Sequence, residues 1–191
     1  MNPAHTDHGS DEQEVHASVR RWIERAVIGL NLCPFARDPV VKGRLRLAVS
    51  RATDADTLLA DLERELALLR DTPAEQLETT LLVHPHVLGD FAAYNDFLPI
   101  AELAVRMYGM QGQVQIASFH PDYQFDDTAP DDIENFTNRS PYPILHLLRE
   151  TSIDAAVAAM DTDGIYERNM QTLRRLGLEG WRALWSETRP S

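Results

Sequence analysis

TTLLV at Thr79–Val83, followed directly by His84 and Pro85, is the stretch that decides the fold class of this 191-residue chain. Its five uncharged residues, all apolar or β-branched, predict a short strand buried on both faces. Upstream, LRLAV at Leu45–Val49 alternates its side chains in the way of a half-buried strand. Between the two strands, residues 53–69 repeat leucine at helical spacing, which predicts a crossover helix.

The same alternation continues on the C-terminal side of this strand. Residues 90–110 have helical periodicity, with a kink or restart expected at Pro99, and VQIASF at Val114–Phe119 predicts a third strand. Strands separated by helices imply crossover connections. The sequence therefore predicts an α/β or α+β fold with a small three-stranded sheet, which becomes four-stranded if a short extra strand forms at Val40–Val41.

Helices from both ends of the chain are expected to pack on this sheet. Residues 14–30 have apolar side chains at helical spacing and predict an amphipathic N-terminal helix. Three C-terminal segments predict further helices: residues 142–150, residues 151–160 and residues 165–176. Residues 1–12 are polar and aperiodic, so we expect a disordered tail followed by a single globular domain over residues 13–191.

Composition narrows the classes of partner. Asp and Glu outnumber Lys and Arg by 30 to 18, for a formal net charge of −12. Proteins bind the phosphates of nucleic acids and anionic membranes through clustered cations, so this acidic composition disfavours both kinds of partner. No apolar run reaches the roughly 18–20 residues that span a bilayer. The single cysteine, Cys33, cannot form an internal disulfide. We therefore expect a soluble cytoplasmic protein that takes a small-molecule ligand and has no nucleic-acid or membrane partner; the oligomeric state stays open.

Two histidines form the first candidate site. His84 and His120 each follow a predicted strand, and if the strands are parallel both imidazoles lie at the sheet edge where ligands of open α/β sheets bind. Imidazole binds divalent transition metals. Asp126 and Asp127, in the acidic loop after His120, could complete a metal site or act as general acid and base. The alternative is structural: the histidines cap their strands through hydrogen bonds, and the aspartates are solvated or cap turns.

A helix N-terminus is the second candidate site. Asn138, Arg139 and Ser140 precede Pro141 and the helix predicted at residues 142–150, with Ser140 as its cap. A helix N-terminus beside an arginine would bind an anionic group of a substrate. The alternative is that Arg139 pairs internally with the acidic loop.

A lone thiol is the third candidate site. Cys33 lies in a turn after the N-terminal helix, with Arg37 close by in the sequence. A thiol near a cation can have a depressed pKa and act as a catalytic nucleophile. The alternative is a buried structural cysteine, because free cysteine is among the most buried residue types.

Several motifs spread along the chain resemble one known family. They are Trp22-Ile23 with Asn31–Phe35 (NLCPF), Ser118–Pro121 (SFHP), Asn138–Pro143 (NRSPYP) and His146–Glu150 (HLLRE). Together they resemble DUF1415, a family of bacterial proteins of unknown function, over nearly the whole chain after the tail. The resemblance implies no activity, cofactor or catalytic residue.

Two functional hypotheses follow from these residues. The first is a small enzyme that acts on a polar or anionic small molecule at the His/Asp/Cys site, with the cofactor unknown and a divalent metal as the candidate. The second is a non-catalytic module that binds a ligand or a protein through the long loop after His120.

Overall fold

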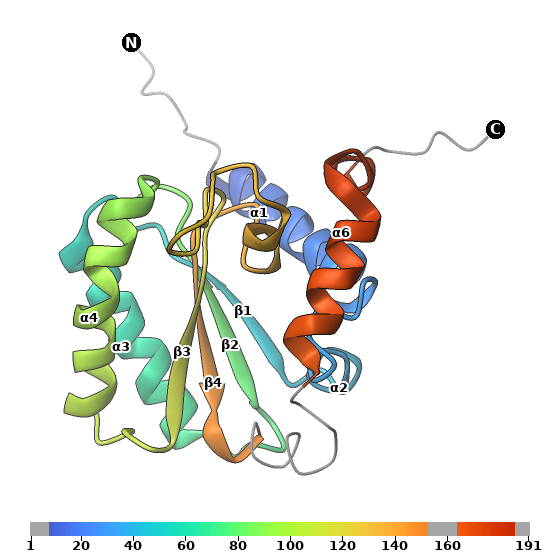
Figure 1. Cartoon of the computed structure of the whole chain (residues 1–191). Coiled ribbons are helices and arrows are strands. Elements are labelled where there is room, and N and C mark those ends of the chain that lie inside the picture. The colour runs from blue at the N-terminus through green and yellow to red at the C-terminus, as the bar shows by residue number, and fades with distance from the viewer. Residues whose placement is uncertain (1–7, 153–163, 186–191) are drawn as a thin grey trace.

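A four-stranded mixed sheet forms the centre of the computed structural model, which describes residues 8–152 and 164–185 (Figure 1). The strands are β1 Leu45–Val49, β2 Thr79–Val83, β3 Val114–Phe119 and β4 Ile144–Arg149, in the spatial order β1-β2-β4-β3. The three strands expected from the sequence are confirmed. β2 is parallel to β1, and β4 is antiparallel to both of its neighbours.

The direction of the strands places the candidate histidines. Because β4 runs against both β2 and β3, the strands β1, β2 and β3 all point the same way, and their C-terminal ends share one edge of the sheet. His84 and His120 follow β2 and β3 directly, so both lie at this edge. The long connection from His120 to Pro143 starts at the same edge and returns the chain into β4.

The fourth strand lies where a helix was expected, so the helix predicted at residues 142–150 is wrong. The run ILHLLR at Ile144–Arg149 is short and apolar, and such runs fit a buried strand and a helix equally well. Its backbone pairs along its whole length with β2 on one side and β3 on the other. The extra strand proposed at Val40–Val41 is also wrong. These residues end a short helix, α2 Arg37–Val41, with Pro39 in its first turn, where proline is tolerated.

Helices cover both faces of the sheet (Figure 1). On one face lie α3 Ala55–Asp71 and α4 Phe91–Met107; on the other lie α1 His8–Trp22, the π-helix η1 Ile23–Ile28 and α6 Ile165–Ala183. β2 serves both layers because successive side chains point to opposite faces. Leu82 packs with α3 and α4, whereas Leu81 and Val83 pack with α1 and α6.

The remaining expectations for the helices have mixed outcomes. Helix α1 starts at His8, inside the segment expected as a tail, and α4 continues through Pro99. Gly177 has φ 65° and ψ 174°, so α6 consists of two helical segments that meet there. Most of the helix expected at residues 151–160 lies outside the described residues. Within the described ranges, no helix is both long and apolar enough to cross a membrane.

Candidate functional site

The structure brings His84 and His120 together around one tyrosine. The ring centroids of His84 and His120 lie 5.8 Å and 5.2 Å from that of Tyr94, on α4. Nδ1 of His84 donates to the carbonyl of Val87 at 3.0 Å, and Nε2 of His120 donates to the carbonyl of Leu88 at 3.2 Å. The two imidazoles thus hold the loop between β2 and α4, which is the capping role of the structural alternative.

Burial determines the protonation of this cluster. Burial lowers the pKa of His84 to about 4, and the nearby His120 contributes to the decrease. Burial also lowers the pKa of His120 and raises that of Tyr94. The Tyr94 hydroxyl donates to the Ile144 carbonyl at 2.7 Å and accepts from the Phe119 N–H at 3.2 Å, which joins the ends of β4 and β3. At neutral pH the cluster is therefore an uncharged, closely packed part of the interior.

The environment of the histidines bears on the metal hypothesis. Both ring nitrogens of His120 are engaged, because Nδ1 accepts the N–H of Asp122 at 3.0 Å. Nε2 of His84 is buried and has no hydrogen-bond partner. Among residues 8–152 and 164–185, no three His, Cys, Asp or Glu side chains lie close enough together to hold a metal ion. Metal binding at His84 and His120 therefore stays a prediction. Residues 8–152 and 164–185 supply no third ligand for such a site.

Asp126 and Asp127 lie on the exposed outer turn of the long loop. The loop is organised instead by Asn135, a fully buried residue of the 3-10 helix η2 Ile133–Thr137. Its Oδ1 accepts from the Phe125 N–H at 2.9 Å and the Thr128 hydroxyl at 2.8 Å, and its Nδ2 donates to the Ala129 carbonyl at 2.8 Å. The acidic loop is therefore a folded element in which Asp126 and Asp127 are exposed to solvent, whereas Glu134 forms an ion pair with Arg174 on α6.

Asn138, Arg139 and Ser140 all make contacts within the protein. Asn138 Nδ2 donates to the Ser118 carbonyl at 3.0 Å, and the Ser140 hydroxyl donates to the Tyr142 carbonyl at 2.6 Å. Because β4 follows, there is no helix N-terminus for Ser140 to cap, and the proposed anion site at such a terminus is wrong.

Arg139 holds the long loop in place. Its Nε and Nη2 donate to the carbonyls of Tyr123 at 3.2 Å and Pro130 at 2.5 Å, and its guanidinium carbon lies 4.3 Å from the centre of the Phe136 ring. The internal contacts of Arg139 are thus with loop carbonyls rather than with the acidic side chains.

Cys33 lies apart from the histidines. It sits in the turn between η1 and α2, and α2 leads into the N-terminal end of β1, opposite the edge that carries His84 and His120 (Figure 1). Burial raises the pKa of its thiol, against a smaller lowering by backbone hydrogen bonds from Phe35 and Ala36. A raised pKa is the opposite of what an activated nucleophile requires.

This environment predicts a slow thiol. Alkylation of Cys33 by iodoacetamide at pH 8 is expected to be about tenfold slower than that of free cysteine, because less thiolate is present and the sulfur is partly covered. Unfolding in urea should restore the rate of free cysteine. A folded protein that reacts as fast as free cysteine would contradict the burial of this thiol.

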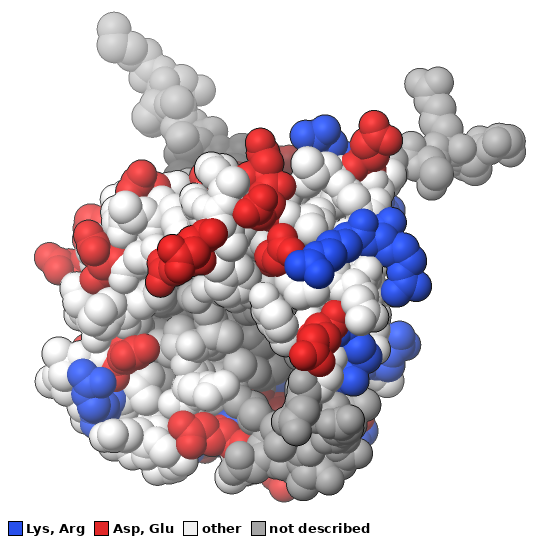
Figure 2. Space-filling model, viewed as in Figure 1, with Lys and Arg blue, Asp and Glu red and all other residues white. Residues whose placement is uncertain are grey.

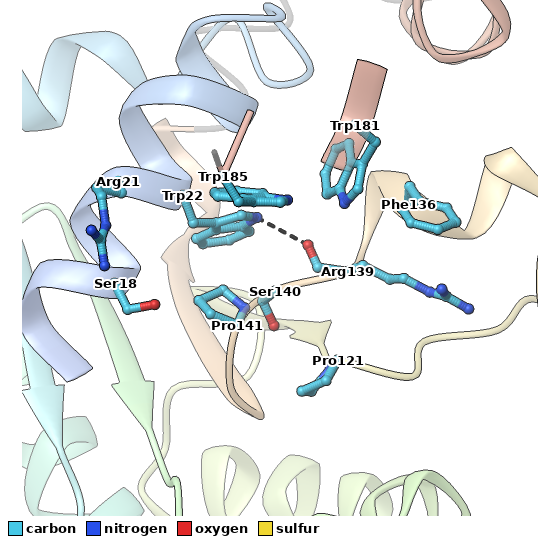
Figure 3. Close-up of a pocket in the computed structure, with 10 residues that line it drawn as sticks. All are labelled: Ser18, Arg21, Trp22, Pro121, Phe136, Arg139, Ser140, Pro141, Trp181 and Trp185. Atoms are coloured by element: carbon cyan, nitrogen blue, oxygen red, sulfur yellow. Dashed lines mark hydrogen bonds between the residues drawn. The ribbon is translucent and has the colours of Figure 1, made fainter. Parts of the chain in front are cut away.

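A cavity lined by aromatic rings opens beside His120, between α1, the long loop and the end of α6 (Figure 3). Its volume is about 630 Å³. The apolar lining consists of aromatic and proline side chains from these three segments: Trp22, Pro121, Phe136, Pro141, Trp181 and Trp185. Nothing in the sequence linked Trp181 and Trp185, near the C-terminal end of the chain, to Trp22.

Contacts between neighbouring rings hold the walls of the cavity in place. Trp22 Nε1 donates to the Arg139 carbonyl at 2.9 Å, and the Trp22 ring meets Phe119 edge to face at 5.2 Å. On the opposite wall, Trp181 lies edge to face against Phe136 at 5.2 Å and against Trp185 at 5.7 Å. Each of these rings thus contacts another aromatic ring in the absence of a ligand.

The charge of the cavity differs from that of the whole protein. Its charged lining residues are Arg21 and Arg139, with no carboxylate among the described lining side chains, although the chain has a net charge of −12. On the face seen in Figure 2, most Lys and Arg side chains lie along the side on which α6 lies, with Asp and Glu side chains among them. Ser18 and Arg21 lie on one side of the cavity, and Phe136 and Trp181 on the other (Figure 3).

The comparisons with known proteins yield a family but no activity. A family model described as a protein of unknown function, DUF1415, matches residues 14–183. The match spans both walls of the cavity except for Trp185, and it includes His84, His120 and Arg139. Neither a curated protein nor a solved structure matches the chain.

Proposed function

Because this chain belongs to the DUF1415 family, whose function is unknown, we propose a function from the geometry alone: a module that binds a planar, anionic small molecule in the aromatic cavity. The observation that carries the proposal is the cavity itself, in which oriented aromatic rings from α1, the long loop and α6 face a common space. This is the second of the two hypotheses drawn from the sequence, with a small molecule as the ligand.

Size and lining support a small-molecule ligand. Ligand pockets in proteins have volumes of about 300–1,000 Å³ and mostly apolar walls with a few polar groups. The cavity, at about 630 Å³, falls within this range. Aromatic walls whose rings are already oriented favour a flat ring system, because stacking then requires little further ordering of side chains.

The charges support an anionic group on that ligand. Arg21 lies on α1 at the side of the cavity away from Trp181, and Ser18, one turn earlier, adds a hydroxyl. Arg139 adds a second positive charge, although two of its donors are engaged with loop carbonyls. A carboxylate paired with an arginine forms the strongest class of hydrogen bond in proteins.

The enzyme hypothesis has less support from the same geometry. Its candidate residues are dispersed: Cys33 lies near the N-terminal end of β1, Asp126 and Asp127 are exposed, and His84 and His120 are buried and bonded to backbone. A reaction requires the reacting groups within hydrogen-bond reach of one another or of the substrate. The cytoplasmic location and the lack of a nucleic-acid partner remain proposals from composition.

Binding of 2-naphthoate, followed by quenching of tryptophan fluorescence, tests the proposal. We expect 2-naphthoate to bind saturably. The dissociation constant of the neutral 2-naphthamide should be at least about fivefold higher, a difference of about 1 kcal/mol in binding free energy. Arg21→Gln should lose this preference for the anion, because it removes the charge and keeps a hydrogen-bonding side chain. Trp185→Ala should weaken the binding of both compounds by removing an aromatic wall.

The matched control is Arg20→Gln. Arg20 is exposed on the same helix and does not line the cavity, so this variant has the same net charge as Arg21→Gln. We expect the preference for naphthoate to persist in it. Absence of saturable binding of both compounds to the wild-type protein, or an equal loss in the two arginine variants, would overturn the proposal.

A further inference from the structure

Helix α4 has an apolar stripe on the side turned away from the sheet. Ile100, Leu103 and Met107 are exposed by 45%, 47% and 77% of their surface. The helix buries a different set of side chains against the sheet and α3: Tyr94, Phe97, Ala101, Ala104 and Val105. The second half of α4 is therefore apolar on two sides, and α4 lies at the outer boundary of the molecule (Figure 1). A helix at the surface of a protein normally turns polar side chains to water, so three large exposed apolar side chains in one row indicate that a partner covers this stripe.

The spacing of the stripe fits a second helix. Asp96, Ile100, Leu103 and Met107 follow one another at intervals of four, three and four residues, which is the seam spacing of paired helices in coiled coils. All of these residues lie within one continuous helix, so the seam is presented on a rigid element.

The charges at the two ends of the stripe determine the direction of the partner. Asp96 lies at the N-terminal end, and Arg106 lies beside Met107 at the C-terminal end. The midpoint of the stripe lies between Ile100 and Leu103, and Asp96 and Met107 are equally far from it. A two-fold axis through this midpoint makes two copies of α4 antiparallel. Ile100 then meets Leu103 of the other copy, and each Asp96 lies next to the other copy's Arg106.

We propose that this face of α4 is a homodimer interface, in which the stripe packs against the same stripe of a second copy around a two-fold axis. A second copy is the partner that supplies an apolar side chain opposite both Ile100 and Leu103 and an opposite charge beside each Asp96. Within one chain, Asp96 and Arg106 are ten positions apart, about 15 Å along the helix, so they cannot pair with each other. A charge pair between them exists only across the dimer.

Sedimentation velocity of the full chain over a concentration series tests this interface. We expect the wild-type protein to sediment as a dimer. Met107→Glu should sediment as a monomer with an unchanged circular dichroism spectrum, because it places a carboxylate against the Asp96 of the other copy. The control is Val41→Glu on α2: Val41 is 76% exposed, against 77% for Met107, and this variant should remain a dimer.

Charge reversal supplies the decisive comparison. Asp96→Arg alone and Arg106→Asp alone should each raise the dimer dissociation constant at least about tenfold, because each brings like charges together. The double variant Asp96→Arg with Arg106→Asp should return the dissociation constant to within about threefold of the wild-type value. A monomeric wild-type protein, dimers that persist in Met107→Glu, or a double variant as weak as the single ones would overturn the proposal.

Discussion

Acidification from pH 7 to pH 4 is expected to lower the free energy of unfolding by about 3 kcal/mol or more through buried histidines alone. Burial holds the pKa of His84 at about 4, whereas a histidine in an unfolded chain titrates near 6.5. Between these two values the unfolded chain binds more protons than the folded protein. Stability is therefore fully present above about pH 6.5 and decreases as the pH falls toward 4.

A second histidine, which is half-buried, acts in the same direction. His146 on β4 has a pKa lowered by burial to about 4, and its Nε2 lies 2.7 Å from the hydroxyl of Thr79. The carboxyl of Asp54, whose pKa is lowered by the Thr57 N–H, affects stability only when the pH falls to about 4 and below. The decrease between pH 6.5 and pH 4.5 therefore reports mainly on the histidines.

Urea unfolding at a series of pH values measures this effect, and His84→Asn isolates one residue. The asparagine amide can replace Nδ1 of His84 as the donor to Val87, but it does not titrate. We expect the variant to have a smaller loss of stability between pH 6.5 and pH 4.5 than the wild-type protein. Equal losses, or an NMR titration of the His84 ring with a midpoint near 6.5, would contradict the assignment.

Replacement of Asn135 by alanine is expected to have the second largest effect, a loss of about 2–4 kcal/mol in the free energy of unfolding. The variant removes all four hydrogen bonds of the Asn135 side chain and leaves the N–H of Phe125 and the carbonyl of Ala129 without this partner. The loop from residue 121 to residue 143 would lose the contact that folds it back on itself. Because this loop carries Phe136, the wall of the cavity that faces Trp22 should loosen as well.

Hydrogen exchange followed by mass spectrometry locates the effect of this variant. Peptides from residues 121–143 should exchange faster in Asn135→Ala, and peptides from α3 should be unchanged at early times. The control Asn95→Ala removes an exposed asparagine from α4 and should change stability by less than about 0.5 kcal/mol. Unaltered exchange in the loop of Asn135→Ala would show that Asn135 does not organise it.

A strand could be predicted from the sequence where a few consecutive residues carry its pattern. β1, β2 and β3 were predictable because alternation and β-branched residues are properties of five or six consecutive positions. β4 was not, because its short run of leucine fits a helix equally well. Only the hydrogen bonds that β2 and β3 offer on either side make it a strand.

The candidate site shows the same division. The sequence placed His84 and His120 at one sheet edge on the condition that their strands point the same way, and the pairings of β1, β2, β4 and β3 meet that condition. It left open whether they bind a metal or hold backbone, and the structure shows both imidazoles bonded to carbonyls of one loop. For Cys33 the tertiary structure determines the burial that raises the pKa of its thiol.

By itself, the sequence determined the alternation of helices with the first three strands, and the family. The tertiary structure decided which of the candidate site residues form hydrogen bonds within the protein, and where the aromatic cavity forms. The physical reason is separation along the chain. Trp22 bonds to Arg139 across 117 positions, and Trp181 closes the opposite wall of the cavity. Local periodicity determines the face on which a residue lies, but only the packing of distant segments determines what that face meets.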